Sequence, residues 1–355
     1  MYDIASIYQA RSVADAIRAL QADPSALVIA GGTDVLIKVR EGKLAGCSLV
    51  SIHGLGEELS GVTQASGGDI EIGPLTTFRG VASDPVIRRC IPVLGEAVDQ
   101  AGGPQLRAAG TIGGNVCNGI TSADSASTLM ALGAVLRVRS PRGEREVPIA
   151  QWYKGVGKVD LAHEELLVKI VIPRANCEGY TGHYIKYAMR SAMDIATLGV
   201  SCLVKLSADK RTVEEARLAF GVAGPVPMRA CGAEAAVRGL PIGEAVGRIG
   251  RAALEDVHPR SSWRASKEFR LQLVEELSGR ALREADGVIG APRMLEAVAA
   301  PGQTALAAVE PQAICAQIRA HPELLRFAVA LSGDVGFFSG ARRLLPLLSG
   351  WDVTV

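Results

Sequence analysis

The residues best suited to chemistry are two adjacent glycines within Thr111-Ile112-Gly113-Gly114-Asn115. Glycine has no Cβ, so a ligand can approach this backbone closely, and short polar side chains flank the pair. The amides of such turns can cradle phosphate groups, and the helix expected after the turn would point its positive end the same way. The pattern therefore favours an anion- or nucleotide-binding turn, although ordinary tight turns also use Gly-Gly.

A second glycine pair lies in Ala30-Gly31-Gly32-Thr33-Asp34, after a short apolar run that predicts a buried strand. Thr33 is a good N-cap for a following helix, and residues 49–52 predict the next strand. Such a β–α–β unit binds nucleotide phosphates where strand passes to helix. The motifs GxGxxG and GxxxxGK[ST] are both absent, which weakens a Rossmann interpretation and excludes a Walker-type ATPase.

The totals of the chain exclude several classes of protein. A length of 355 residues predicts two or three domains, and a formal net charge of +1 gives no argument for nucleic acid or an anionic membrane. We find no signal peptide and no apolar run long enough to span a bilayer, so a cytoplasmic location is expected. The seven cysteines are scattered, which excludes the usual iron–sulfur and zinc spacings. We therefore expect no metal on this chain.

Further along the chain, the pattern predicts strands at 70–72, 134–140, 144–149 and 166–172. Helices are expected at 91–101 and 125–132, the second capped by Ser122 or Asp124. A polar segment at 174–179 marks a domain boundary, after which three strands precede three helices. That order argues for an α+β fold. We expect a first domain at 1–176 with lobes at about 1–55 and 56–176, a second domain at 177–288, and an extension of unknown role at 289–355. The early part of this extension reads as a linker with a helical fragment.

Several of these segments occur together and in order: LVIAGGTD from Leu27, GPLTTF from Gly73, AGTIGGN from Ala109, TSADSA from Thr121 and YIKYAMRSAMDIATLGV from Tyr184. In this combination the sequence closely resembles the FAD-binding subunits of molybdenum hydroxylases, bacterial xanthine dehydrogenase type, from Met1 to about Ala285. The resemblance implies a two-lobed FAD-binding domain of the vanillyl-alcohol-oxidase (PCMH) type. It also implies a smaller domain with a three-stranded antiparallel sheet and helices.

The resemblance also implies a non-covalent FAD site. Two glycine turns would hold the pyrophosphate, the strand before the first turn would lie beside the adenine-bearing half, and one aliphatic side chain would contact the cofactor. An aspartate would hydrogen-bond the ribityl and ribose region. The residues carried over are Leu27, Val28, Ile29, Ala30, Gly31, Gly32, Thr33, Asp34, Thr111, Ile112, Gly113, Gly114, Asn115, Asp124, Val168 and Lys186.

Lys186 matches a lysine near the polar edge of the isoalloxazine. A cation there would stabilise negative charge that develops on reduction and would raise the reduction potential. A solvated strand lysine is the plainer interpretation of Lys186, and a simple helix N-cap is the plainer interpretation of Asp124. The segment 187–195 matches a loop near the flavin that shapes nicotinamide access, and Asp194 within it fits a loop or cap residue better than a catalytic one.

The functional expectation is an electron-transfer subunit of a xanthine dehydrogenase-type enzyme. Partner subunits would carry the molybdopterin centre and two [2Fe–2S] clusters, FAD on this chain would pass electrons to NAD⁺, and the assembly would be a dimer of heterotrimers. No protein acid or base is required, so no catalytic residue is expected. Three alternatives remain: an aldehyde, carbon monoxide or nicotinate type of hydroxylase, a flavin-free assembly subunit, and a stand-alone oxidase with flavin attached through His or Cys.

Overall fold

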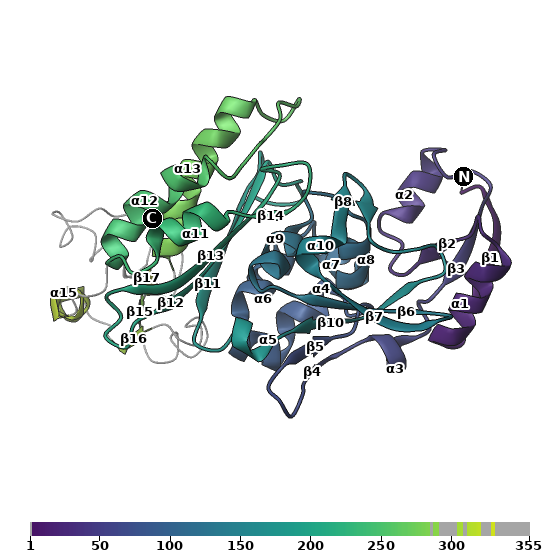
Figure 1. Cartoon of the computed structure of the whole chain (residues 1–355), viewed down its shortest axis with the longest axis horizontal. Coiled ribbons are helices and arrows are strands. Elements are labelled where there is room, and N and C mark those ends of the chain that lie inside the picture. Colours follow the sequence, from purple (N-terminus) through teal and green to yellow (C-terminus); the bar gives the residue numbers. More distant parts are fainter. Residues whose placement is uncertain (1, 285–286, 291–303, 308–310, 321–327, 331–355) are drawn as a thin grey trace.

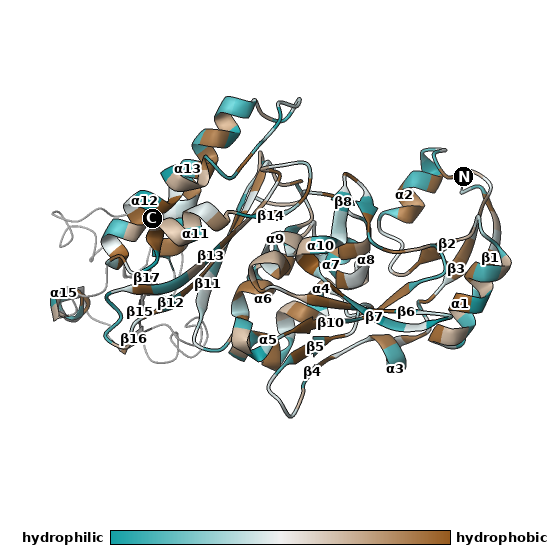
Figure 2. Ribbon diagram, viewed as in Figure 1, coloured by the Kyte–Doolittle hydropathy of each residue, from teal (hydrophilic) through white to brown (hydrophobic). Residues whose placement is uncertain are grey.

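The computed structural model describes residues 2–284, 287–290, 304–307, 311–320 and 328–330. Three bodies follow one another in Figure 1: a small N-terminal lobe, a larger second lobe, and a sheet covered by helices. In Figure 2 hydrophobic and hydrophilic residues are mixed along the ribbon of all three bodies. No helix in the described ranges combines the length and apolar character needed to cross a membrane.

The first lobe is a three-stranded parallel sheet in the order β1-β3-β2, formed by Ile4–Gln9, Cys47–Ser51 and Leu27–Ile29. Two helices accompany it: α1 (Val13–Ala22) and α2 (Val35–Arg40). Ser12 caps α1 by accepting a hydrogen bond from the Asp15 amide. The parallel pairing of β2 and β3 is what the β–α–β pattern predicted. β1 was not predicted, because nearly all of its side chains are exposed and carry no burial pattern.

The second lobe is a five-stranded antiparallel sheet with helices on it. Its strand order is β4-β5-β10-β6-β7, formed by Val62–Gln64, Ile70–Ile72, Leu166–Ile172, Val135–Ser140 and Gly143–Pro148. The helices and remaining short elements of both lobes are α3 Gly56–Leu59, α4 Phe78–Ser83, α5 Pro85–Cys90, α6 Pro92–Asp99, α7 Pro104–Ala109, α8 Ile112–Cys117, α9 Asp124–Ala131, α10 Ile149–Trp152, β8 Tyr153–Gly155, β9 Lys158–Val159 and the 3₁₀ turn η1 Arg174–Asn176. Every residue of α9 is buried, so this helix forms the centre of the lobe.

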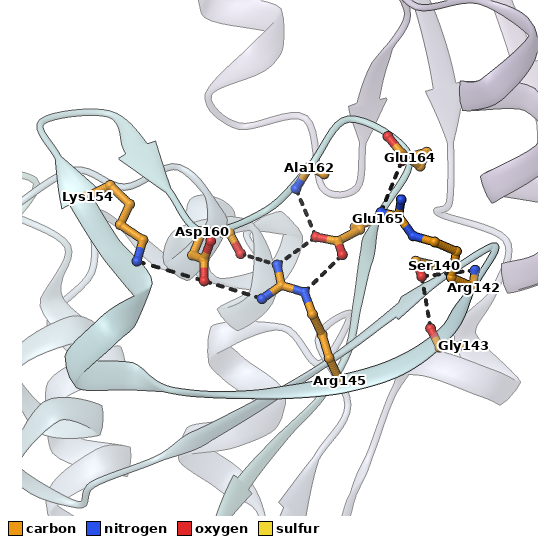
Figure 3. A network of polar contacts seen from close by, with 9 residues as sticks. All are labelled: Ser140, Arg142, Gly143, Arg145, Lys154, Asp160, Ala162, Glu164 and Glu165. Carbon is orange, nitrogen blue, oxygen red and sulfur yellow. Dashed lines mark hydrogen bonds and ion pairs between the residues drawn. The ribbon is translucent and has the colours of Figure 1, made fainter.

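A cluster of ion pairs fixes the loop that leads into β10 (Figure 3). Arg145 on β7 donates to both carboxylate oxygens of Glu165, at 2.9 and 2.7 Å, and to the Asp160 carbonyl at 2.8 Å. The Glu165 side chain is only 5% exposed, so this bidentate pair works in a partly desolvated setting. The hydrogen bonds from Arg145 lower the pKa of Glu165 against the opposing effect of burial.

The second domain is a four-stranded antiparallel sheet, β11 to β14 in sequence order, with three helices. The strands are Thr181–Tyr187, Leu198–Leu206, Val213–Gly221 and Met228–Arg229, and the helices are α11 Cys231–Val237, α12 Ile242–Ala253 and α13 Lys267–Arg283. The expected count of three strands misses β14, which is too short to show an alternating pattern. The sheet also contacts the first domain, because the buried hydroxyl of Ser201 lies 2.7 Å from that of Thr128 on α9.

The described part of the extension contains four elements: β15 Gly287–Gly290, β16 Thr304–Ala307, α15 Pro311–Ala320 and β17 Ala328–Ala330. The three strands pair in parallel in the order β16-β15-β17. The expectation of a linker with a helical fragment is therefore wrong for residues 304–307, where Ala and Leu extend into a strand. Residues 311–313 of that segment are helical, as the start of α15, whereas 291–303 and 308–310 lie outside the described residues, as does the apolar terminus beyond 330.

Candidate cofactor site

The first glycine turn presses directly against the segment before the second. A Cβ added to Gly31 would lie 1.9 Å from the Ala109 carbonyl oxygen, so only glycine fits there. Gly32 adopts a φ of +71°, which other residues rarely tolerate. The two motifs, about 80 residues apart in sequence, thus meet backbone to backbone. Lys38 on α2 adds a second link, donating to the Asn118 side chain just after α8 at 3.2 Å.

The first turn offers free backbone donors. Within the described chain, the N–H groups of Gly31, Gly32, Thr33 and Asp34 have no hydrogen-bond acceptor, while the Gly32 carbonyl accepts from Leu36 at 3.0 Å. These residues are half-buried. Unsatisfied, partly buried amides are rare, and four in succession form the concave donor array that binds phosphate oxygens. The residues present therefore fit a diphosphate.

Thr33 does not cap α2, contrary to expectation. The N-cap is Asp34, and its side chain makes no capping bond. The Asp34 carboxylate instead pairs with Lys38 at 2.6 Å, one helical turn later. The Thr33 hydroxyl has no partner among the described residues, which leaves it available to a ligand.

The second turn differs from the first because the protein itself uses its amides. Ile112 and Gly113 donate to the carbonyls of Thr76 and Pro74, at 3.0 and 2.9 Å. The Gly114 amide donates to the Thr111 hydroxyl at 3.1 Å, which makes Thr111 the N-cap of α8. The expected loop is therefore the first turn of a short helix. A Cβ on Gly113 would meet Pro74 at 2.4 Å, so this glycine serves close packing rather than open donors.

Around this turn, Gly114 is exposed and the Asn115 side chain accepts from Ser125 at 2.7 Å. The turn can thus offer a ligand its exposed glycine surface and the side-chain Nδ2 of Asn115, because the Asn115 backbone amide donates to the Thr111 carbonyl at 3.1 Å. The main structural role of the turn is to fix the position of Ala109, two residues before it, whose carbonyl packs against Gly31 of the first turn.

Asp124 and Lys186 meet at the boundary between the two domains. The Lys186 ammonium lies 3.0 Å from one Asp124 carboxylate oxygen and donates to the Gln100 carbonyl at 2.9 Å. The Tyr184 hydroxyl donates to the other Asp124 oxygen at 2.9 Å. The side chains of Lys186 and Asp124 are 7% and 10% exposed, so Lys186 is not a solvated strand lysine. Asp124 occupies the first helical position of α9, not its N-cap, which is Ala123.

The electrostatics of this pair modify the expectation for Lys186. Burial raises the pKa of Asp124, and Lys186 and Tyr184 oppose that shift by favouring the carboxylate. Because Asp124 neutralises much of the ammonium charge, Lys186 is a weaker electrostatic stabiliser than an isolated cation. An ammonium has three donors, and two are used here, so one remains for a ligand.

Val168 connects the lobes. It lies on β10 of the second lobe, at a register irregularity between Leu167 and Lys169, and its side chain is 7% exposed. That side chain belongs to the apolar cluster of the first lobe, against which Val28 and Ala30 also pack. The aliphatic residues expected beside the adenine-bearing half therefore gather in one place. β2 itself, Leu27 to Ile29, is half-exposed along its whole length.

The segment after β11 is an ordered loop at the edge of this region. Asp194 accepts from the Arg190 and Ile195 amides at 3.0 and 2.8 Å, which supports the interpretation of Asp194 as a loop residue. Met193 has a φ of 53° and packs against Gly103. The loop thereby contacts the turn that follows Gln100, the residue whose carbonyl binds Lys186.

Sequence reasoning missed two partners of the site. Tyr184 supplies a buried hydroxyl to Asp124, and Gln100 supplies its backbone carbonyl to Lys186. Tyr184 and Lys186 are two residues apart on one strand, so they share a face, and that spacing is a signal that could have found the tyrosine. A carbonyl contact such as that of Gln100 leaves no trace in residue type.

The prominent cavities of the described chain lie elsewhere. One of about 500 Å³ is lined by residues of the β4 end, the β4–β5 turn, α5, the segment 174–181, β12 and the β12–β13 turn, including Arg89, Arg174 and Tyr180. Another lies beside the Arg145 cluster. Neither is lined by the glycine turns. Among the described residues, no group of three or more His, Cys, Asp or Glu could hold a metal ion.

Comparison with known proteins identifies the family. Residues 3–175 match the FAD binding domain in molybdopterin dehydrogenase, and residues 183–285 match the CO dehydrogenase flavoprotein C-terminal domain. The chain is 44% identical over 291 residues to the putative xanthine dehydrogenase FAD-binding subunit of Escherichia coli (strain K12), covering 82% of this chain and 99% of that one. The chain belongs to the FAD-binding subunits of molybdenum hydroxylases, xanthine dehydrogenase type.

More distant relatives support the same family and fold. The carbon monoxide dehydrogenase medium chain of Hydrogenophaga pseudoflava is 28% identical over 277 residues, covering 78% of this chain and 94% of that one. A solved carbon monoxide dehydrogenase from the same organism, which lacks the Mo-pyranopterin moiety of its cofactor, superimposes with a TM-score of 0.75 at 27% identity. It covers 80% of this chain and 98% of its own. The expected α+β fold and FAD as cofactor are thus confirmed.

Proposed function

We propose that this subunit holds FAD between its two lobes and passes electrons from [2Fe–2S] clusters of a partner subunit to NAD⁺. The observation that carries the proposal is the run of four free amides from Gly31 to Asp34, in a chain that also contains the buried Asp124–Lys186 pair. Bound FAD would supply chemistry that no side chain here offers, namely one-electron acceptance and hydride release. The protein's own contribution is binding, orientation and electrostatics.

In this proposal the first turn, with the Thr33 hydroxyl, binds the diphosphate, and the second turn forms the wall that positions it. Val28, Ala30 and Val168 supply apolar contact for the adenine-bearing half. Asp124 accepts a hydrogen bond from the sugar-alcohol chain, and the third proton of Lys186 is donated toward the polar edge of the ring. The proposed cofactor residues are Leu27, Val28, Ile29, Ala30, Gly31, Gly32, Thr33, Asp34, Thr111, Ile112, Gly113, Gly114, Asn115, Asp124, Val168 and Lys186.

The finer parts of the proposal concern partners and substrate. We propose a molybdopterin-binding subunit and a [2Fe–2S] subunit as partners, assembled as a dimer of heterotrimers in the cytoplasm. The seven free cysteines fit a reducing compartment. Xanthine or hypoxanthine is favoured over carbon monoxide, because identity is 44% to the xanthine dehydrogenase relative and 28% to the carbon monoxide relative. Domain limits of 1–176, 177–288 and 289–355 are part of the same proposal.

Two measurements test the core of this proposal. The purified full chain should be yellow and should release FAD in equal molar amount when denatured with acid. The proposed cofactor residues offer hydrogen-bond donors and apolar contacts, and none of them is a His or Cys that could bond covalently to the flavin. A colourless chain would favour the flavin-free assembly subunit, and flavin that stays on the denatured protein would favour a covalent oxidase.

The purified complex tests the electron path. It should reduce NAD⁺ when supplied with xanthine, and co-purifying molybdopterin and [2Fe–2S] subunits should account for its metal content. Reduction supported only by an aldehyde, nicotinate or carbon monoxide would overturn the substrate class. Reduction of oxygen with no NAD⁺ dependence would overturn the acceptor.

A further inference from the structure

Two neighbouring loops expose an unusual amount of apolar surface. They are the segment 187–195, which begins at the last residue of β11, and the segment 258–269, which runs into the first turn of α13. The large exposed apolar side chains on them are Tyr187, Met189, Met193, Ile195, Trp263 and Phe269, with Trp263 78% exposed. These six are half of the twelve such residues in the described chain. Exposed apolar groups concentrated in this way mark interaction sites more often than isolated ones do.

The two loops form one surface. The rings of Tyr187 and Phe269 meet edge to face, with centroids 5.6 Å apart. Beneath them, the buried Arg270 guanidinium donates to the Thr197 carbonyl at 3.2 Å and to the Ser262 hydroxyl at 2.9 Å. It also donates to the carbonyls of Arg260 and Ala265. One side chain therefore fixes the end of the first loop to the second, so the surface is formed in advance and costs little to order on binding.

The surface is also basic. Residues 258–269 contain Arg260, Arg264 and Lys267 against the single carboxylate Glu268, three positive charges less one negative, or +2. The Arg264 guanidinium stacks on the Trp263 ring at 4.1 Å, and its Nε has no partner within the described chain. Trp and Arg are the residue types most enriched at the energetic centre of protein interfaces. A partner surface that complements this one in charge would therefore be acidic.

Its position is specific as well. Tyr187 directly follows Lys186 on β11, and Met193 packs against Gly103, close to the Gln100 carbonyl that binds Lys186. The surface therefore adjoins the edge of the proposed flavin site. Electron transfer slows steeply with distance, so a protein that donates electrons to the flavin must dock nearby. In Figure 1, one end of α13 and the loop that joins it extend past the end of the four-stranded sheet.

We infer that this surface, defined by Tyr187, Met189, Met193, Trp263, Arg264 and Phe269, docks the protein that delivers electrons to the flavin, through an acidic face that receives the Trp263 indole. The inference rests on the proposed function, in which that donor is the [2Fe–2S] subunit. Trp263 and Arg264 anchor the contact, and Arg270 positions both loops.

The test uses the full chain and the [2Fe–2S] subunit that co-purifies with it. Trp263→Ser and Arg264→Glu are made separately, and FAD content, binding of the [2Fe–2S] subunit and reduction of the flavin by that subunit are measured. Both variants should keep the wild-type FAD content and bind the subunit at least about tenfold more weakly, with slower reduction of the flavin. Arg264→Glu should also reduce the salt dependence of binding, since it removes a cation from the contact.

Matched controls lie on distant surface. Ile7→Ser removes another apolar side chain, 56% exposed, and Arg18→Glu, on α1 of the first lobe, reverses a charge whose side chain is 69% exposed. Both should bind the subunit as the wild type does. Wild-type binding by Trp263→Ser and Arg264→Glu, with normal FAD content, overturns the docking surface alone. Loss of FAD in these variants also counts against it, since the loops would then serve the cofactor. Absence of any [2Fe–2S] subunit with the wild type overturns the proposed function and this inference together.

Discussion

Among single residues, Gly31 has the least freedom to change. Its missing Cβ is the space occupied by the Ala109 carbonyl, 1.9 Å from where that carbon would be. A contact of that length between backbones cannot be relieved by a rotamer change, so the two turns would have to separate. The binding geometry of the first turn therefore depends on the position of the second.

Gly31→Ala should accordingly lose FAD. We expect less than a tenth of the wild-type FAD content in the purified variant, together with a lower melting temperature, since overpacking typically costs about 1–3 kcal/mol. Gly54→Ala is the matched control, because a Cβ there meets nothing within 4 Å. Released flavin and thermal unfolding are measured for both. Normal FAD content in Gly31→Ala would show that the turns do not need this contact.

Lys186→Met should destabilise the protein by about 3–5 kcal/mol, because it leaves the Asp124 carboxylate buried without its cation. The pKa of Asp124, already raised by burial, should rise further. A carboxyl whose pKa is raised by folding is more stable protonated, so the deficit should shrink as pH falls through that pKa and grow as pH rises. Urea unfolding across pH measures it.

The double variant Lys186→Met, Asp124→Asn provides the control. Removing the charge from both partners should recover part of the lost stability and abolish the added pH dependence. A double variant whose loss of stability equals the sum of the losses in Lys186→Met and Asp124→Asn made separately would show that the pair is not coupled.

At the scale of elements, three segments are joined by one histidine. His183 on β11 lies 3.2 Å from Glu96 on α6 and 2.8 Å from Glu284 at the end of α13. Burial lowers its pKa, but hydrogen bonds to Glu284 and Glu96 outweigh that effect and raise it to about 9. The imidazolium thus links the second lobe to both the sheet and the last helix of the second domain.

This link predicts a pH dependence of stability. A histidine whose folded pKa is raised contributes fully below its unfolded value of about 6.5, and the contribution is lost as pH rises through about 9. The full effect would be at most about 3 kcal/mol. Urea unfolding at pH 6 and pH 10 should therefore show a smaller difference for His183→Gln than for the wild type. The exposed His53→Gln should behave as the wild type, and an unchanged difference in His183→Gln would contradict the link.

Elements also show how far the sequence determines the site. Both glycine pairs and the strand of Val168 could be predicted, because turns and strands leave patterns in neighbouring residues. Which backbone amides stay free could not be predicted. Those of Ile112 and Gly113 donate to the carbonyls of Thr76 and Pro74, which are distant in sequence and come close only in the folded chain. For the same reason the pairing of Asp124 with Lys186, 62 residues apart, is invisible to local patterns. β1 escaped prediction because its side chains face solvent.

At the scale of the whole molecule, the matched family domains end at residue 285, and the extension adds a separate parallel sheet. A chain that ends at Gly290 should therefore keep its FAD content and melt within a few degrees of the full chain. It keeps Glu284 and hence the His183 link. Flavin release and thermal unfolding check this expectation. Loss of FAD from the shortened chain would show that the extension supports the cofactor site.

The buried pair of Asp124 and Lys186 draws one carboxylate from the first domain and one ammonium from the second. During synthesis the glycine turns emerge well before β11 does, so a nascent chain would contain the glycine turns and Asp124 but not yet Lys186. We expect cofactor loading to wait until translation has passed the second domain, with the unfinished chain having little affinity for flavin.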